Sequence, residues 1–275
     1  MSGGLKQQLP FRMVADSQSR ILITEPFLAL VQVLDTKQGT WSQIRGERDH
    51  RLDFPTYIAV DGFDNIYLSE PFLSAVLVYQ PDGRFLRSIG TDHLRTPFGL
   101  AIDQASRKLY VADHALNQVQ VYSLEGQLLQ TIANSGREPG ELAAPCDLEF
   151  RDGNLVVLDS GNSRFQIFDL KGESVAVWPF GLDRLPYAFT FDPLGNMYYV
   201  DLESRGMLVT NAKDAALASL DIKIPYGQPG NPNGLLSFTT VSRAMDGSIL
   251  ALRPGFTVDV MQLQPQPQEQ QAKLQ

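Results

Sequence analysis

The chain has 275 residues and a net charge of −8, with 43% of its residues apolar and 20% charged. This length allows one large all-β domain or two small domains, and the composition is that of an ordinary globular protein. The acidic balance disfavours a nucleic-acid partner, because contacts to a phosphate backbone need clustered Lys and Arg. No apolar run is long enough to predict a membrane span, and the single cysteine, Cys146, excludes an intrachain disulfide.

The N-terminus lacks the apolar segment of a secretory signal peptide. Two compartments therefore stay open. The protein is cytoplasmic if this N-terminus is native, and extracytoplasmic if a signal peptide has been removed.

Two markers recur along the chain. An apolar run ends in an acid five times and in arginine at its sixth copy, with copies about 45 residues apart. These runs end at Glu25, Glu70, Asp113, Asp159, Asp201 and Arg253. A proline also precedes an aspartate by six residues at four places, Pro10 with Asp16, Pro55 with Asp61, Pro97 with Asp103 and Pro186 with Asp192. Six repeats of this length occupy almost the whole chain.

The repeat unit consists of four short strand patterns. In the second repeat the expected strands are 56–60, 66–69, 75–79 and 85–89, separated by turns rich in Gly, Asn and Asp. No segment keeps a helical period, and four-stranded units repeated at this interval are typical of propeller blades. We therefore predict an all-β fold, a six-bladed β-propeller of four-stranded antiparallel blades over residues 10–263.

The two ends of the chain fall outside the repeats. The sixth repeat has strand patterns at 238–243, 249–252 and 257–263 but no fourth strand. The Gln- and Pro-rich residues 264–275 predict a disordered tail. The N-terminal segment 1–9 is the candidate for a closing strand that would complete the sixth blade and cover its edge.

The fourth repeat resembles an NHL repeat. Residues 135–145 resemble the segment between NHL blades, and residues 153–169 continue with a Gly-Asn turn, a strand ending in Asp159 and the step Gly161-Asn162-Ser163-Arg164. Ser163 stands where the family has its histidine, and the other repeats mostly lose the Asn-x-Arg step. The resemblance implies a six-bladed propeller and no particular activity, because propellers carry many unrelated functions.

The recurring acids suggest a cation ring, but the same residue type repeats in five blades. We therefore expect each acid to cap the backbone N–H groups of its own turn, and regard Arg253 as more informative. Three histidines, His50, His93 and His114, are candidate zinc ligands on one face, as in the amidating lyase among six-bladed relatives. Neutral surface histidines are the favoured alternative. No cofactor is predicted, and a divalent metal is left open.

The turns after the acids differ between repeats. They carry Phe27 and Leu28 in the first, Phe72 and Leu73 in the second and Leu116 in the third, but are polar in the fourth and fifth. These residues form either an exposed partner-binding patch or core between blades. Candidate ligand-binding residues at the channel mouth are Tyr57, Phe98, Tyr187 and Arg253.

No catalytic residue can be assigned, since the nucleophile elbow, phosphate loop and dinucleotide fingerprint are absent from the sequence. The sequence predicts a soluble monomeric propeller that binds a protein or peptide through the face carrying these turns. The alternative is a metal-dependent lyase or lactonase with its site at the channel mouth. RNA binding, known in some animal NHL proteins, would need a local basic patch from Arg45, Arg48, Arg51 and Arg95.

Overall fold

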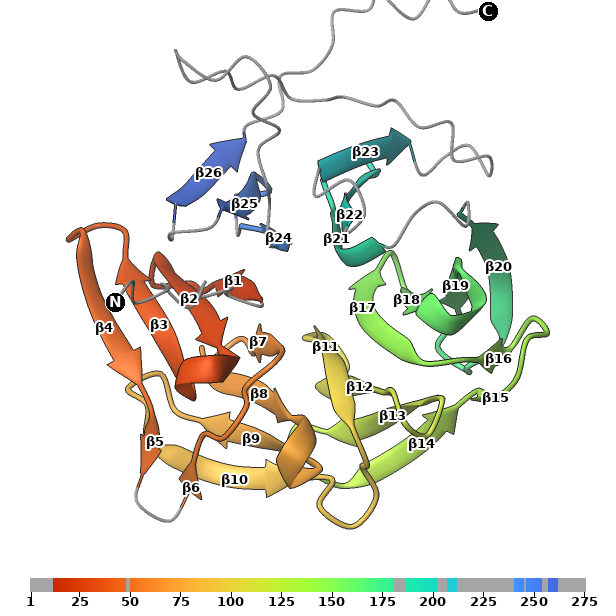
Figure 1. The fold of residues 1–275 in the computed structure, drawn as a ribbon, viewed down its shortest axis with the longest axis horizontal. Coiled ribbons are helices and arrows are strands. Elements are labelled where there is room, and N and C mark those ends of the chain that lie inside the picture. Colours follow the sequence, from red (N-terminus) through yellow and green to blue (C-terminus); the bar gives the residue numbers. More distant parts are fainter. Residues whose placement is uncertain are drawn as a thin grey trace, which may run out of the picture.

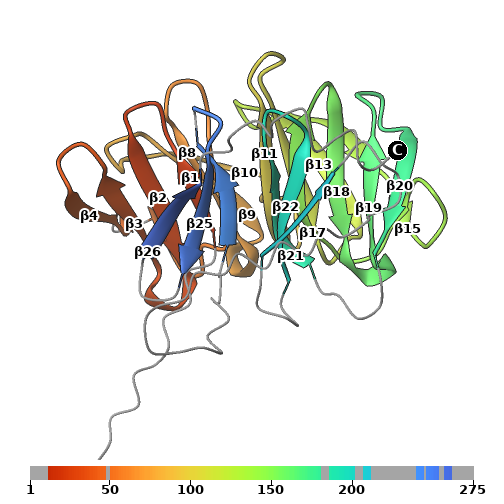
Figure 2. The same cartoon turned by 90° about the horizontal axis from the view of Figure 1, so that it is seen from above.

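Antiparallel sheets are arranged around a common central axis (Figure 1). The computed structural model describes residues 12–47, 50–180, 186–201, 207–211, 240–244, 246–253 and 257–261. Figure 2, at right angles, shows the strands of neighbouring sheets running in similar directions. In this part of the chain no helix is long and apolar enough to cross a membrane.

Four sheets are complete four-stranded blades. The first contains β1 (Met13–Ala15), β2 (Arg20–Glu25), β3 (Leu30–Asp35) and β4 (Thr40–Ile44). The second contains β7 (Ile58–Val60), β8 (Ile66–Glu70), β9 (Ala75–Tyr79) and β10 (Phe85–Ile89). The third contains β11 (Pro97–Asp103), β12 (Lys108–Asp113), β13 (Gln118–Ser123) and β14 (Leu128–Ile132). The fourth contains β17 (Pro145–Arg151), β18 (Asn154–Asp159), β19 (Arg164–Phe168) and β20 (Ser174–Pro179).

Two further sheets have three described strands each. One contains β21 (Pro186–Phe191), β22 (Asn196–Asp201) and β23 (Met207–Asn211), and the other β24 (Thr240–Arg243), β25 (Ile249–Arg253) and β26 (Thr257–Met261). Two short pairs lie between blades: β5 (Gly46–Glu47) with β6 (His50–Arg51), and β15 (Asn134–Ser135) with β16 (Glu141–Leu142).

The prediction of six four-stranded blades is wrong in its count, because only four described sheets have four strands. The expected closing strand in 1–9 and the expected tail at 264–275 lie outside the described residues.

The proline and aspartate markers bracket the innermost strands. Pro97 begins β11, where a missing N–H is tolerated. At the other end of the second blade's innermost strand, Asp61 accepts hydrogen bonds from the N–H groups of Phe63 and Asn65, both at 2.9 Å. This side-chain cap of the hairpin explains why the aspartate recurs.

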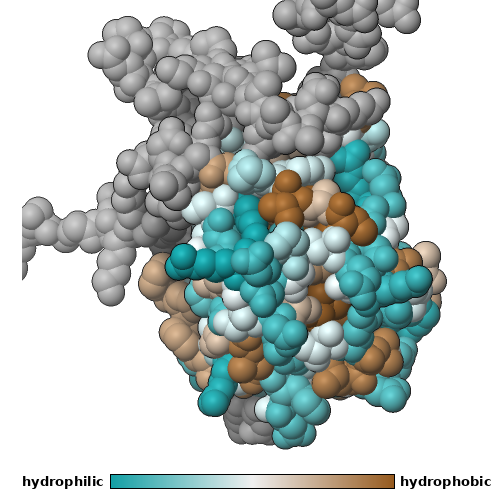
Figure 3. Space-filling model, turned by 90° about the vertical axis from the view of Figure 1, so that its right-hand side faces the viewer, coloured by the Kyte–Doolittle hydropathy of each residue, from teal (hydrophilic) through white to brown (hydrophobic). Residues whose placement is uncertain are grey.

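The core lies between neighbouring sheets. Tyr67 and Val78 of the second blade pack with Val111 of the third, and all three are almost fully buried. The innermost strands contact one another in the order β1, β7, β11, β17, β21, β24 and back to β1. On the outer side near β20, by contrast, small hydrophobic areas are scattered among hydrophilic ones (Figure 3).

Candidate functional site

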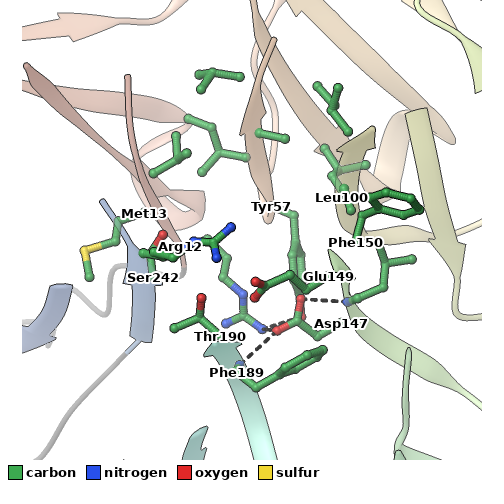
Figure 4. Close-up of a pocket in the computed structure, with 18 of the residues that line it drawn as sticks. Arg12, Met13, Tyr57, Leu100, Asp147, Glu149, Phe150, Phe189, Thr190 and Ser242 are labelled. Carbon is green, nitrogen blue, oxygen red and sulfur yellow. Dashed lines mark hydrogen bonds and ion pairs between the residues drawn. The ribbon is translucent and has the colours of Figure 1, made fainter. Parts of the chain in front are cut away.

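The innermost strands line a cavity of about 240 Å³ in the channel, which is open to solvent. Residues from all six of these strands line it. Figure 4 shows Arg12 in the middle, with Asp147 and Glu149 of β17 and Thr190 of β21 pointing towards it. A carboxylate-bearing cavity on the channel axis is therefore the first candidate site.

Arg12 is a buried cation at the start of the first blade. Only 5% of it is exposed, and its guanidinium donates to the Tyr57 hydroxyl, the Tyr187 carbonyl and the Asp147 carboxylate, the last at 3.3 Å. The guanidinium carbon lies 4.1 Å from the Tyr57 ring centroid and 4.4 Å from that of Tyr187. A cation between two ring faces and a carboxylate ties the first, second, fourth and fifth repeats together at one end of the cavity.

Burial controls the titration of the groups around Arg12. It raises the pKa of Asp147 to about 6, although Arg12 acts in the opposite direction. Burial also raises the pKa of the Tyr57 and Tyr187 hydroxyls, and that of the Cys146 thiol to about 12. Cys146 therefore stays a neutral thiol near pH 7.

The cavity wall is polar on one side only. Matching positions on the innermost strands of three neighbouring sheets carry Glu149, Thr190 and Ser242. They match because each lies opposite the equivalent residue of the next strand in its sheet, β18, β22 or β25. The matching residues of the other three sheets are Val14, Ala59 and Ala101. The repeat therefore places three polar side chains beside three apolar ones at one level of the channel.

Glu149 and Arg243 carry opposite charges on this polar side. Burial raises the pKa of Glu149 to about 7, while Arg243 and the Thr190 hydroxyl act to lower it. Arg243 is the next residue after Ser242 and is exposed. The two charges both line the cavity, yet no ion pair within 4.0 Å joins these two described residues.

The predicted channel residues partly meet at this site. Tyr57 and Tyr187 hold Arg12, and Phe98 lies with its ring centroid 6.1 Å from that of Tyr57. The side chain of Arg253 lies outside the described residues. Whether these residues bind a ligand stays a prediction.

Arg12, Asp147, Glu149 and Arg243 were missed from the sequence. A signal for the first two exists, because Arg12, Tyr57 and Asp147 each stand two residues after a proline, namely Pro10, Pro55 and Pro145. At the same offset the third repeat has Gly99, where a Cβ would lie 2.8 Å from the Cα of Asp147. Aligning the repeats at this position points to residues of the channel, whereas the more conspicuous terminal acids do not.

The terminal acids are structural anchors. All five are at most 3% exposed, and Glu70 accepts hydrogen bonds from the N–H groups of Asp53 and Phe54 at 3.2 and 2.7 Å. Asp159 accepts likewise from Ala143. The expectation that each caps its own turn is wrong for Glu70, since its turn has no side-chain cap. The segment between blades offers N–H groups without ladder partners, and the acid binds those instead.

Asp113 combines both roles. It accepts from the N–H groups of Arg95 and Thr96 in the preceding connection, and from Leu116 in its own turn.

The candidate zinc ligands are not brought together. The His50 ring stacks on Phe85 with centroids 3.7 Å apart, and His114 packs edge-on against Phe98. His93 is exposed. Across the described ranges, no three or more His, Cys, Asp or Glu side chains are grouped so that they could hold a metal ion.

A second candidate site lies on the turns. The turns η1 (Pro26–Leu28) and η2 (Pro71–Leu73) leave Phe27 72% and Phe72 71% exposed. Phe54 lies between them, with centroid distances of 5.4 Å to Phe27 and 4.9 Å to Phe72. Leu28 and Leu73 are also exposed, whereas Leu116 is half-buried. Of the two alternatives, surface or core, the phenylalanines lie at the surface; we name Phe27, Leu28, Phe54, Phe72 and Leu73 the apolar turn patch.

Comparison with known proteins places the fold. No family model matches the chain. The uncharacterized protein YwcC of Lactococcus lactis subsp. lactis (strain IL1403) is 25% identical over 156 residues, which is 51% of this chain and 44% of that protein. The match thus spans less than half of that relative's length.

Two solved structures cover more of the chain. A streptogramin B lyase has a TM-score of 0.68 at 12% identity, covering 96% of this chain and 86% of the lyase chain. A chain of a nidogen/laminin complex has a TM-score of 0.67 at 20% identity, covering 78% of this chain and 80% of its own. Similarity at these identities shows the fold alone, and membership of the NHL family stays a prediction. The chain is a β-propeller with four-stranded antiparallel blades.

Proposed function

We propose that the protein binds a protein or peptide partner through the apolar turn patch. The observation that carries this proposal is the row of three contacting rings, Phe27, Phe54 and Phe72, whose two outer members are mostly exposed. Aromatic side chains dominate the energetics of interfaces, and an exposed apolar cluster marks an interaction site.

The chemistry of the partner follows from the patch and from the charge of the chain. Adjacent rings of this kind accept an apolar or aromatic side chain of an extended peptide. The net charge of −8 favours a partner with basic residues around that anchor, because complementary charge accelerates encounter. The propeller of the nidogen/laminin complex is a neighbour in fold that was solved with a protein partner.

Selection of a displayed random peptide library on the whole protein tests this proposal. We expect enriched peptides with an aromatic or large aliphatic anchor, bound at least about tenfold more weakly by Phe27→Ser/Phe72→Ser, a loss of about 1.4 kcal/mol. The urea midpoint of unfolding should be unchanged, since both side chains are mostly exposed. The matched control is Leu170→Ser, which removes an apolar side chain that is 48% exposed elsewhere.

Two outcomes would contradict the proposal. One is equal binding of the enriched peptides to the double variant and to wild type. The other is unfolding of the double variant under conditions where Leu170→Ser is stable, which would make the rings core residues.

The alternative proposal is a metal-dependent lyase or lactonase acting in the channel. The cavity with Asp147 and Glu149 favours it, because carboxyls with raised pKa values mark many reactive sites. Elemental analysis of the purified protein, together with a lactone-hydrolysis assay, tests it. Stoichiometric metal and turnover that Glu149→Gln abolishes would support it, and metal-free protein without turnover would refute it.

A further inference from the structure

The channel cavity has one polar and one apolar side, as the repeat register shows. Glu149, Thr190 and Ser242 face Val14, Ala59 and Ala101 at one level. Apolar residues of β7, β11 and β17, namely Val60, Leu100, Ile102 and Phe150, also line the cavity. A two-sided cavity of this kind fits a small molecule with a polar end and an apolar end.

The charges on the polar side are a separated pair. Glu149 and Arg243 line the cavity from β17 and β24, with β21 between those strands, and no ion pair within 4.0 Å joins them. The other two charges at the cavity are already matched, since Arg12 binds Asp147. Glu149 and Arg243 therefore remain as one anion and one cation, separated from each other, for a ligand to bind.

We propose that the channel cavity binds a small zwitterion with an apolar side chain, of the class of apolar α-amino acids. Glu149 would face the ligand ammonium group, Arg243 its carboxylate, and Thr190 and Ser242 would hydrogen-bond at the same end. The side chain would lie against Val14, Ala59 and Ala101 on the apolar side.

The energetics of Glu149 favour such an occupant. Burial disfavours the charged form of this carboxyl and raises its pKa to about 7. An ammonium group beside it supplies the opposite charge that a buried carboxylate needs. Arg243 is exposed at its side of the cavity, and guanidinium groups bind carboxylates through two parallel hydrogen bonds.

Calorimetric titration of the full chain with three matched probes tests the proposal. The probes are L-leucine, 4-methylpentanoate, which lacks the ammonium group, and 3-methylbutylamine, which lacks the carboxylate. We expect saturable binding of leucine with a Kd on the order of 1 mM or lower, and at least about tenfold weaker binding of each analogue.

Two variants assign the charges. Glu149→Gln should remove the preference for leucine over 4-methylpentanoate, and Arg243→Gln the preference for leucine over 3-methylbutylamine. Arg84→Gln, at an arginine whose side chain is 69% exposed, is the control and should bind leucine as wild type does.

The proposal is overturned if folded wild type shows no saturable leucine binding at millimolar concentrations, or binds all three probes equally. It is also overturned if both channel variants bind leucine like wild type. If a variant does not fold, the comparison of the three probes on wild type decides alone. The outcome is independent of the peptide-binding proposal, since the apolar turn patch is not involved.

Discussion

The turn that follows the terminal acid has the same backbone conformation in the second and fourth blades. The side chains on its outer and inner sides differ between the two blades. The turns η2 and η3 (Ser160–Asn162) each end in a left-handed residue, Ser74 and Ser163, both with φ of 53°. Outward, the second blade shows Phe72, and the fourth shows Gly161 at the same place.

On the inner side, the two blades differ in whether the terminal acid has a basic partner. Asp159 pairs with Arg164, whose Nε lies 2.7 Å from the carboxylate. The equivalent partner of Glu70 is Ala75, and among the described residues no basic side chain forms an ion pair with Glu70. The same backbone thus holds an acid with a cation in one blade and without one in the other.

Arg164 also organises the connection before its blade. Its guanidinium donates to the carbonyl oxygens of Arg137, Glu138 and Glu141 at 2.7 to 2.9 Å. The Asn-x-Arg step, which carried the NHL resemblance, is therefore a buried clamp on the segment between blades. The repeat thus preserves the backbone of the turn, while single substitutions decide its charge and its surface.

The largest effect should come from removing the clamp. Arg164→Ala leaves Asp159, which is 0% exposed, without its cation. We expect a loss of about 3–5 kcal/mol in the free energy of unfolding, because an uncompensated buried charge is strongly destabilising. Urea denaturation measures it. The control Arg84→Ala removes an exposed pair with Asp82 and should cost less than about 1 kcal/mol; equal losses would show that Arg164 is no clamp.

A second effect should appear in the dependence of stability on pH. Burial raises the pKa of Glu70 from its ordinary value to about 7, so the folded chain holds this proton more tightly than the unfolded chain. The contribution of Glu70 is therefore fully present below the unfolded pKa and is lost as the pH rises towards and through 7. Each such group lowers stability by up to about 1.4 kcal/mol per pH unit in that window.

Glu70→Gln removes this titration. Between pH 5 and 8, its free energy of unfolding should fall less steeply than that of wild type. Urea denaturation across this range compares the slopes, with Glu173→Gln, an exposed carboxylate, as the control. Parallel curves for wild type and Glu70→Gln would contradict the expectation. Burial also raises the pKa of Asp147 and Glu149, so part of the slope should remain.

The smallest expected effect on stability comes from the left-handed residue that ends these turns. Ala29 ends the first blade's turn with φ of 52°, a conformation that costs an L-residue about 1–2 kcal/mol. Ala29→Gly should therefore raise the free energy of unfolding by up to about 1 kcal/mol, as measured by thermal unfolding. The matched control Ser42→Gly lies in the exposed strand β4 and should be destabilising. A loss in both variants would show that the turn stores no strain.

Most strands could be predicted from the sequence, because alternation and turn residues are local signals. The expected strands 75–79 and 85–89 coincide with β9 and β10, and the expected 66–69 differs from β8 by one residue. The blade count failed at the fifth and sixth sheets, which have three described strands each. Exposure of Phe27 and Phe72 could not be decided either, because a turn can lean inward or outward with the same sequence pattern.

The sequence by itself determined the repeat, the strand pattern, the recurring acids and the asymmetry between turns, since each depends on residues close together in the chain. The tertiary structure alone decided what the acids bind and what fills the channel. Arg12 and Asp147 are 135 residues apart, and although each stands two residues after a proline, the sequence does not show that they form an ion pair. They meet because the innermost strands close around one axis, where burial selects charged groups that can compensate each other.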